Sequence, residues 1–164
     1  MFESGPIIVA LDGSKPAETA LPVAIALARL YAAPIRFVHV VDDDLPLESP
    51  SQLSDGSAAF AGYVDGLLKA ADAGALPREI VVQRGPPART ILDAGGDGRL
   101  VVIASRGRGG LRAVLGSVAD RVVRGSPVPV LIVPAEGNAP LAGGAIVVGL
   151  DGSAVAAVGL WAAR

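Results

Sequence analysis

The stretch that decides the fold reads Leu100-Val-Val-Ile103, followed directly by Ala104-Ser-Arg-Gly-Arg-Gly-Gly-Leu-Arg-Ala-Val-Leu-Gly-Ser117. An apolar strand that opens into a loop rich in glycine and arginine, and then into a helix, is typical of a phosphate-binding turn. Glycines let the backbone approach an anion and present its N–H groups. A helix that begins near Ser117 adds unpaired N–H donors, and the arginines of the loop add full charges. The stretch therefore predicts a nucleotide or another phosphate ligand held by backbone amides.

Length and composition exclude several classes of protein. The chain has 164 residues, enough for one ordinary domain with roughly 20 to 30 residues to spare. It has no cysteine, and its single histidine, His39, lies in an apolar strand, so we expect neither a zinc site nor a catalytic triad. The net charge of −2 argues against a nucleic-acid binder. No signal peptide or bilayer-length apolar run is evident, so we expect a cytoplasmic protein that does not bind membranes.

Apolar runs of strand length alternate with helical patterns along the chain. Their β-branched residues and lack of polar alternation predict strands buried on both faces. The predicted strands are 6–11, 35–41, 79–83, 100–104, 128–133 and 145–150. The predicted helices are 16–31, 57–73, 87–94 and 117–124, with Pro22 marking a lost hydrogen bond or a kink in the first. Strict alternation predicts an α/β fold, an open parallel sheet with helices on both faces.

The end of the chain repeats its beginning. Ile7-Ile-Val-Ala-Leu-Asp-Gly-Ser14 returns as Ile146-Val-Val-Gly-Leu-Asp-Gly-Ser153. We therefore divide the chain into a domain of residues 1–134, a linker of residues 135–144, and the start of a second, incomplete repeat at 145–164. An isolated strand–helix unit cannot bury its own apolar face, so we expect its strand to pair with this sheet's edge or with another chain. Within the domain, the acidic segment 42–56 predicts a loop.

These features together resemble the universal stress protein family, small α/β nucleotide-binding proteins that often occur as tandem pairs. The resemblance is carried by Ile7 to Ser14, Val38-His-Val-Val41, Ser105-Arg-Gly-Arg-Gly-Gly-Leu111, Gly116-Ser-Val-Ala-Asp-Arg-Val-Val123 and Ser126-Pro-Val-Pro-Val-Leu-Ile-Val133. It implies an adenine nucleotide alpha hydrolase-like sheet of five strands in the order 3-2-1-4-5. That order places strands one and four together at a switch point, where ligands bind beyond the carboxyl ends of the strands.

The phosphate loop departs from the family pattern at two places. In ATP-binding members the motif is Gly, two residues, Gly, nine residues, then Gly-Ser or Gly-Thr, whereas this chain has Ala104 at the first glycine and eight residues between Gly107 and Gly116. The extra glycines of the loop can absorb the change, or the deletion can misplace the N–H groups. Both alternatives remain open at this point.

The resemblance assigns site residues one by one. Asp12 contacts the nucleoside end of ATP, and the backbone of Val40 meets adenine. The phosphate-loop positions are Ala104, Gly107, Gly116, Ser117 and Val118.

Each assignment has a structural alternative. Asp12 can be a turn former beside Gly13, with Ser14 capping the first helix. Ser117 can cap the last helix, with Asp120 completing a capping-box-like pair. The run of acids at residues 42–44 is read as solvated, so no metal site is expected.

The resemblance therefore predicts a stress-response sensor or regulator that binds ATP, alone or with Mg²⁺. We expect no enzymatic activity beyond slow ATP hydrolysis, since no nucleophile is visibly paired with a base. A homodimer is expected through the fifth strand or the C-terminal strand. The alternative is a nucleotide-free dimerisation module of the same family, in which the altered loop has disabled the pocket.

Overall fold

The computed structural model describes residues 4–41, 51–106 and 115–136, with only the backbone given for 51–55. The strands are β1 (Ile7–Ala10), β2 (Ile35–Val41), β3 (Arg78–Arg84), β4 (Leu100–Ala104) and β5 (Val130–Val133). The helices are α1 (Lys15–Glu18), α2 (Ala20–Tyr31), α3 (Ser51–Ala70), α4 (Pro87–Gly95) and α5 (Ser117–Gly125).

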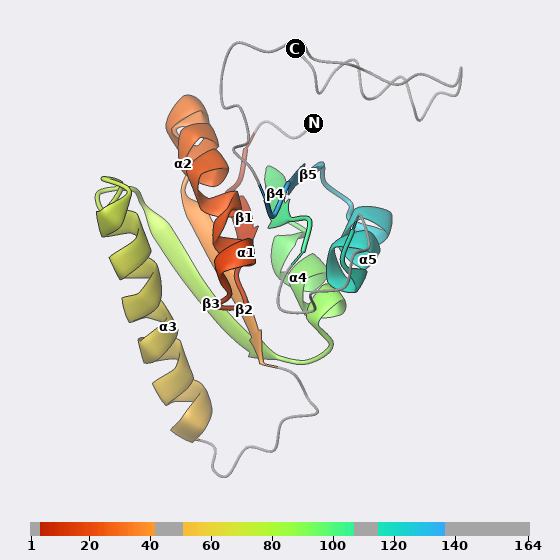
Figure 1. The fold of residues 1–164 in the computed structure, drawn as a ribbon, viewed down its shortest axis with the longest axis horizontal. Helices are drawn as coiled ribbons and strands as arrows, with labels where there is room; N and C mark the ends of the chain where they lie inside the picture. Colours follow the sequence, from red (N-terminus) through yellow and green to blue (C-terminus); the bar gives the residue numbers. More distant parts are fainter. Residues whose placement is uncertain (1–3, 42–50, 107–114, 137–164) are drawn as a thin grey trace.

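The five strands form one parallel sheet in the order β3-β2-β1-β4-β5, as predicted. The helices cover both faces, with α2 and α3 on one side of the sheet and α4 and α5 on the other (Figure 1). Because β1 lies in the middle, its side chains alternate between the two cores: Ile7 and Val9 pack toward α2 and α3, and Ile8 packs toward α4 and α5.

The expectation that every strand is buried on both faces is wrong for the two edge strands. β3 and β5 consist mostly of half-buried or exposed residues, whereas β1 and β4 are almost entirely buried. An edge strand has a neighbouring strand on one side only. Its side chains therefore lie at the margin of the helix layers, where they are less completely covered. β5 also begins at Val130 rather than at 128, because Pro129 has no N–H to donate to a ladder.

The first predicted helix is divided into α1 and α2 at Thr19. Pro22 stands in the first turn of α2 and cannot donate a hydrogen bond to the carbonyl four residues earlier, that of Glu18. The Thr19 hydroxyl instead donates to the carbonyl oxygen of Pro16 at 2.8 Å, which closes the turn. The predicted defect at Pro22 is thus a break in the helix just before it.

α3 begins at Ser51 and ends at Ala70, so the predicted loop at 42–56 is wrong over its last six residues. Its polar first turns carry little apolar periodicity, which is the signal that sequence reasoning uses. Residues 42–50 lie outside the described residues, as do most of the predicted linker and the whole predicted repeat at 145–164.

Gly98 provides a test of the packing between the α4–β4 connection and β1. A Cβ at this position would lie 2.6 Å from Cγ1 of Ile8, which is fully buried and cannot move aside. We expect Gly98→Ala to lower the free energy of unfolding by about 1–3 kcal/mol, because it overpacks the core. Urea unfolding measures this loss.

The matched control is Gly74→Ala, whose Cβ would meet nothing within 4 Å. Its effect should be close to zero. Equal losses for the two variants would contradict the packing argument.

Candidate functional site

The candidate site lies where the carboxyl ends of β1 and β4 meet. The two strands are paired in parallel, with Ile7 opposite Leu100 and Val9 opposite Val102. The chain leaves β1 into the turn at Asp12 and leaves β4 at Ala104, so the two loops singled out in the sequence emerge side by side at one edge of the sheet. This is the convergence that the strand order predicts.

Asp12 organises the turn that leads into α1. One carboxylate oxygen, Oδ1, accepts a hydrogen bond from the Ser14 N–H at 2.9 Å, and Gly13 adopts a left-handed φ of 78°. Ser14 in turn caps α1, because its Oγ accepts the Ala17 N–H at 3.4 Å. The structural alternative for Asp12 is therefore observed. It leaves a half-buried carboxylate at the mouth of the site.

A tyrosine that the sequence analysis did not single out stands behind this turn. The Tyr63 hydroxyl, on α3, donates to Oε1 of Glu18 at 3.0 Å, and Lys15 holds the other oxygen of Glu18 at 2.8 Å. Burial, the hydrogen bond to Glu18 and the charges of Glu18 and Asp12 raise the pKa of Tyr63 above its ordinary value. Tyr63 thus links α3 to the helix that follows Asp12.

His39 packs beside the same turn. Its Nδ1 donates to the carbonyl oxygen of Leu11 at 2.9 Å, since a carbonyl oxygen can only accept. Its ring stacks on Phe60 of α3 with a centroid separation of 4.8 Å. These contacts give His39 a structural role. Val40, the next residue, is half-buried against the opposite core, on the side of α4 and α5.

Ser105, the first residue after β4, connects the end of this strand to neighbouring segments through its hydrogen bonds. Its N–H donates to Val133 at 2.7 Å, its carbonyl accepts from the Gly116 N–H at 2.7 Å, and its hydroxyl accepts from the Ala135 N–H at 3.0 Å. The hydrogen bond to Gly116 holds the two ends of the glycine-rich stretch together. Ala104 itself is buried at the end of β4.

The structural alternative for Ser117, capping of the last helix, is not observed. Gly116 is the N-cap residue of α5, Ser117 is the first helical residue, and no side chain caps the helix within the described part of the chain. Asp120 does not form a capping box, because its carboxylate pairs with Arg124 at 3.0 Å. The start of α5 therefore presents backbone N–H groups that no side chain caps in the part of the chain that the structure describes.

Neither its backbone conformation nor its packing against the described residues requires glycine at position 116. Its φ of −70° suits any residue. A Cβ there would lie 3.4 Å from the Ser105 carbonyl oxygen and 3.6 Å from Cα of Arg106, which are ordinary contacts. Of the predicted positions, Asp12, Ala104, Gly116, Ser117 and Val118 gather at one edge of the sheet. Gly107 lies outside the described residues.

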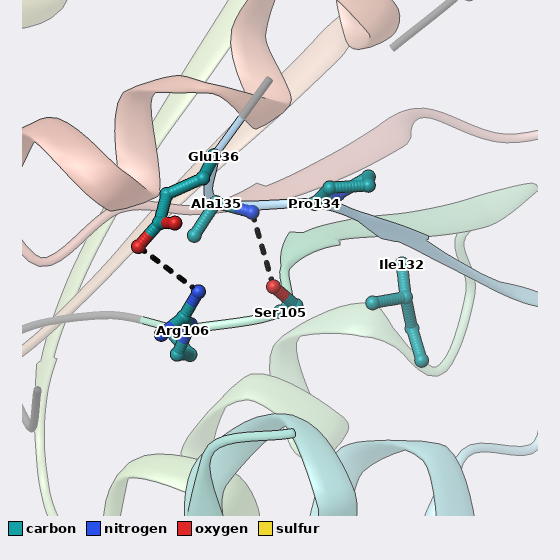
Figure 2. Close-up of a pocket in the computed structure, with 6 residues that line it drawn as sticks. All are labelled: Ser105, Arg106, Ile132, Pro134, Ala135 and Glu136. Atoms are coloured by element: carbon teal, nitrogen blue, oxygen red, sulfur yellow. Dashed lines mark hydrogen bonds and ion pairs between the residues drawn. The ribbon is translucent and has the colours of Figure 1, made fainter. Parts of the chain in front are cut away.

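A shallow hollow of about 480 Å³ opens on the β5 side of this region. Ser105 and Arg106 form one wall, and Ile132 together with residues 134–136 forms the other (Figure 2). Nη2 of Arg106 pairs with Oε1 of Glu136 at 3.1 Å across it. The hollow therefore borders the predicted phosphate region without containing Asp12 or Val40.

Within residues 4–41, 51–106 and 115–136, no three side chains of the metal-ligating acidic and histidine types gather into a possible metal site. The acidic run at 42–44 is outside those ranges. No helix in the described ranges has the length and apolar character needed to cross a membrane.

Comparison with known proteins identifies relatives of one kind. The sequence model of the universal stress protein family matches residues 3–134. A universal stress protein of Mycolicibacterium smegmatis is 31% identical over 134 residues, which cover 78% of this chain and 45% of that protein. One from Mycobacterium tuberculosis is 30% identical over 136 residues, covering 79% and 45%. The chain thus spans about half the length of the curated relatives it matches.

Solved structures share the fold. A universal stress protein from Lactobacillus plantarum has a TM-score of 0.61 and 25% identity, covering 79% of this chain and 97% of its own. A universal stress protein solved with cAMP has a TM-score of 0.60 at 24% identity, covering 80% and 98%. One from Archaeoglobus fulgidus, solved with dAMP, has a TM-score of 0.57 at 24% identity, covering 79% and 97%. At 24% identity, the last two structures show a similarity to this chain in fold alone.

The contact between Tyr63 and Glu18 makes a testable contribution to stability. A group whose pKa is raised by folding stabilises the protein fully below its ordinary pKa of about 10 and loses that contribution as the pH rises further. We expect Tyr63→Phe to cost about 0.5–1.5 kcal/mol at neutral pH, the value of one hydrogen bond. The variant should also lose less stability than the wild type above pH ~10.

Urea unfolding at neutral and alkaline pH measures both effects. Tyr31→Phe, which removes the hydroxyl of the exposed tyrosine on α2, is the control. Identical pH profiles for the wild type and Tyr63→Phe would contradict the assignment.

Proposed function

The chain belongs to the universal stress protein family, and on that basis we propose that it binds an adenine nucleotide, ATP foremost, at the carboxyl edge of its sheet. The observation that carries the proposal is the start of α5. Its first amides have no side-chain cap among the described residues, and neither φ nor packing against those residues requires glycine at position 116. A glycine that the scaffold does not require is explained if a ligand approaches the backbone at that point.

The proposed placement of ATP follows the residues at the edge. The phosphates would lie against Gly107, Gly116, Ser117 and Val118, where helix amides and their partial positive charge favour an anion. The half-buried Asp12 carboxylate suits ribose hydroxyl groups, because it accepts hydrogen bonds and repels phosphate.

The adenine end would meet the backbone of Val40, and Ala104 takes the place of the first glycine of the family motif. Mg²⁺ can accompany the phosphates as their counter-ion.

The neighbours of known structure agree with an adenine nucleotide. One was solved with cAMP and another with dAMP, and both share this strand arrangement. The two ligands have adenine and one phosphate in common. These neighbours support the adenine nucleotide class as the proposed ligand, and ATP is our specific choice within it.

We assign the protein a regulatory rather than a catalytic role, as a stress-response sensor in the cytoplasm. The features that support this role are amides and a carboxylate suited to binding, with the single histidine engaged in structural contacts. Slow hydrolysis of bound ATP is compatible with the role.

A second proposed property is homodimerisation through β5. The strand is paired with β4 on one side, and its Leu131 and Ile132 are 37% and 36% exposed. An exposed apolar edge strand is a template for pairing with another strand. The same surface supports the alternative of a nucleotide-free dimerisation module. The C-terminal strand proposed at 145–150 is the other candidate partner for this edge.

We retain the proposed division of the chain into a domain of residues 1–134, a linker of residues 135–144 and a partial repeat at 145–164. Each of the curated relatives described above is more than twice as long as the matched region. A tandem arrangement agrees with that length.

ATP binding can be tested by thermal unfolding. Mg-ATP at 100 times its Kd should raise the Tm of the wild type by about 5–10 °C, because a ligand that binds only the folded state stabilises it. Gly116→Val should abolish most of the shift, since its branched side chain occupies the space before the helix amides.

The control is Gly62→Val on α3, where an added Cβ meets nothing within 4 Å. It should keep the shift. A wild type whose Tm is unchanged by ATP, AMP and cAMP would favour the nucleotide-free alternative.

The dimer can be tested by native mass spectrometry. Ile132→Asp places a charge on the proposed interface and should convert dimers into monomers, because a buried unpaired carboxylate is costly. Leu30→Asp, at a residue that is 72% exposed on α2, should remain dimeric. A monomeric wild type would refute the proposed interface.

A further inference from the structure

We propose that Glu136 sets the affinity for the phosphate end of the nucleotide, because it occupies the guanidinium of Arg106 that a bound phosphate would use. The inference rests on the proposed function and adds to it a residue from the segment that follows β5.

Arg106 stands next to the uncapped start of α5. The carbonyl of the preceding residue, Ser105, accepts the Gly116 N–H at 2.7 Å, and a Cβ on Gly116 would lie 3.6 Å from Cα of Arg106. The backbone of Arg106 is therefore packed against the helix N-terminus. An anion at the amides of Ser117 and Val118 is within reach of a side chain as long as arginine.

The chain that leaves β5 brings a carboxylate to the same place. The Ser105 hydroxyl accepts the Ala135 N–H at 3.0 Å, which ties this segment to the end of β4. The next residue, Glu136, then pairs with Arg106 at 3.1 Å, and the two side chains point toward each other (Figure 2). A negative charge thus stands on an arginine that lies beside the proposed phosphate position.

Of the two side chains in this ion pair, that of Glu136 can leave the pair at the lower cost. The side chain of Glu136 is 82% exposed, whereas that of Arg106 is 29% exposed. Leaving the pair returns Glu136 to water at little cost, because exposed ion pairs are weak. A phosphate offers Arg106 a bidentate, more highly charged partner. Binding therefore exchanges one anion for another, and the exchange subtracts from the affinity.

The experiment is a double-mutant cycle on nucleotide affinity. Isothermal titration calorimetry would give the Kd of ATP and of adenosine for the wild type, Glu136→Gln, Arg106→Gln and the double variant. Glu136→Gln should tighten ATP binding about two- to five-fold, the range expected for one exposed ion pair. Arg106→Gln should weaken ATP binding. The double variant should match Arg106→Gln, and adenosine, which lacks a phosphate, should bind all four proteins equally.

The matched control is Asp93→Asn, which neutralises a carboxylate in another exposed ion pair, with Arg89 on α4. It changes the net charge as Glu136→Gln does and should leave the Kd of ATP unchanged.

Each alternative result has a distinct meaning. If ATP binds but Glu136→Gln has no effect, or tightens binding equally in the Arg106→Gln background, the role of Glu136 is refuted and nucleotide binding stands. If neither the wild type nor Glu136→Gln binds ATP or adenosine, both the proposed function and this inference are overturned.

Discussion

The parallel pairing of β1 with β4 is the constraint on which the rest of this structure depends. Strands two and three lie on one side of β1, and strands four and five lie on the other. The loops after β1 and β4 therefore leave the sheet next to each other and lead to helices on opposite faces. At such a point of divergence in an open α/β sheet, ligands are generally bound beyond the carboxyl ends of the strands. Asp12 and the start of α5 follow this same edge of the sheet because of the strand order.

Much of the fold could be predicted from the sequence, for identifiable reasons. β2 and β4 have the predicted bounds, because each is a strand-length run rich in β-branched residues with turn-forming or polar residues on both sides. α4 lies within one residue of its predicted bounds, since Pro87 can start a helix and paired glycines end it. The early start of α3 was missed because its first turns are polar and owe their helical state to context rather than to a pattern.

The site was predictable as a location, but its contacts were not. Motif spacing placed Asp12 and Gly116 at one edge, since strand ends are readable from the sequence. The structural alternative for Ser117, a helix cap, is not observed, because a hydroxyl beside a helix start can be the cap or the first helical residue, and one residue of register decides which. Its contact with phosphate stays a prediction. Tyr63 and Glu136 carried no local signal. Their partners lie 45 and 30 residues away in the sequence, respectively. Local sequence patterns do not predict contacts over such separations.

The hydrogen bond between Ser105 and Gly116 has a consequence for changes in loop length. Its N···O distance of 2.7 Å brings the two ends of the glycine-rich stretch together, whatever the number of residues between them. Closing a loop between fixed ends costs little more when the loop gains or loses a residue. An insertion or deletion in this stretch should therefore have little effect on the stability of the sheet that carries it.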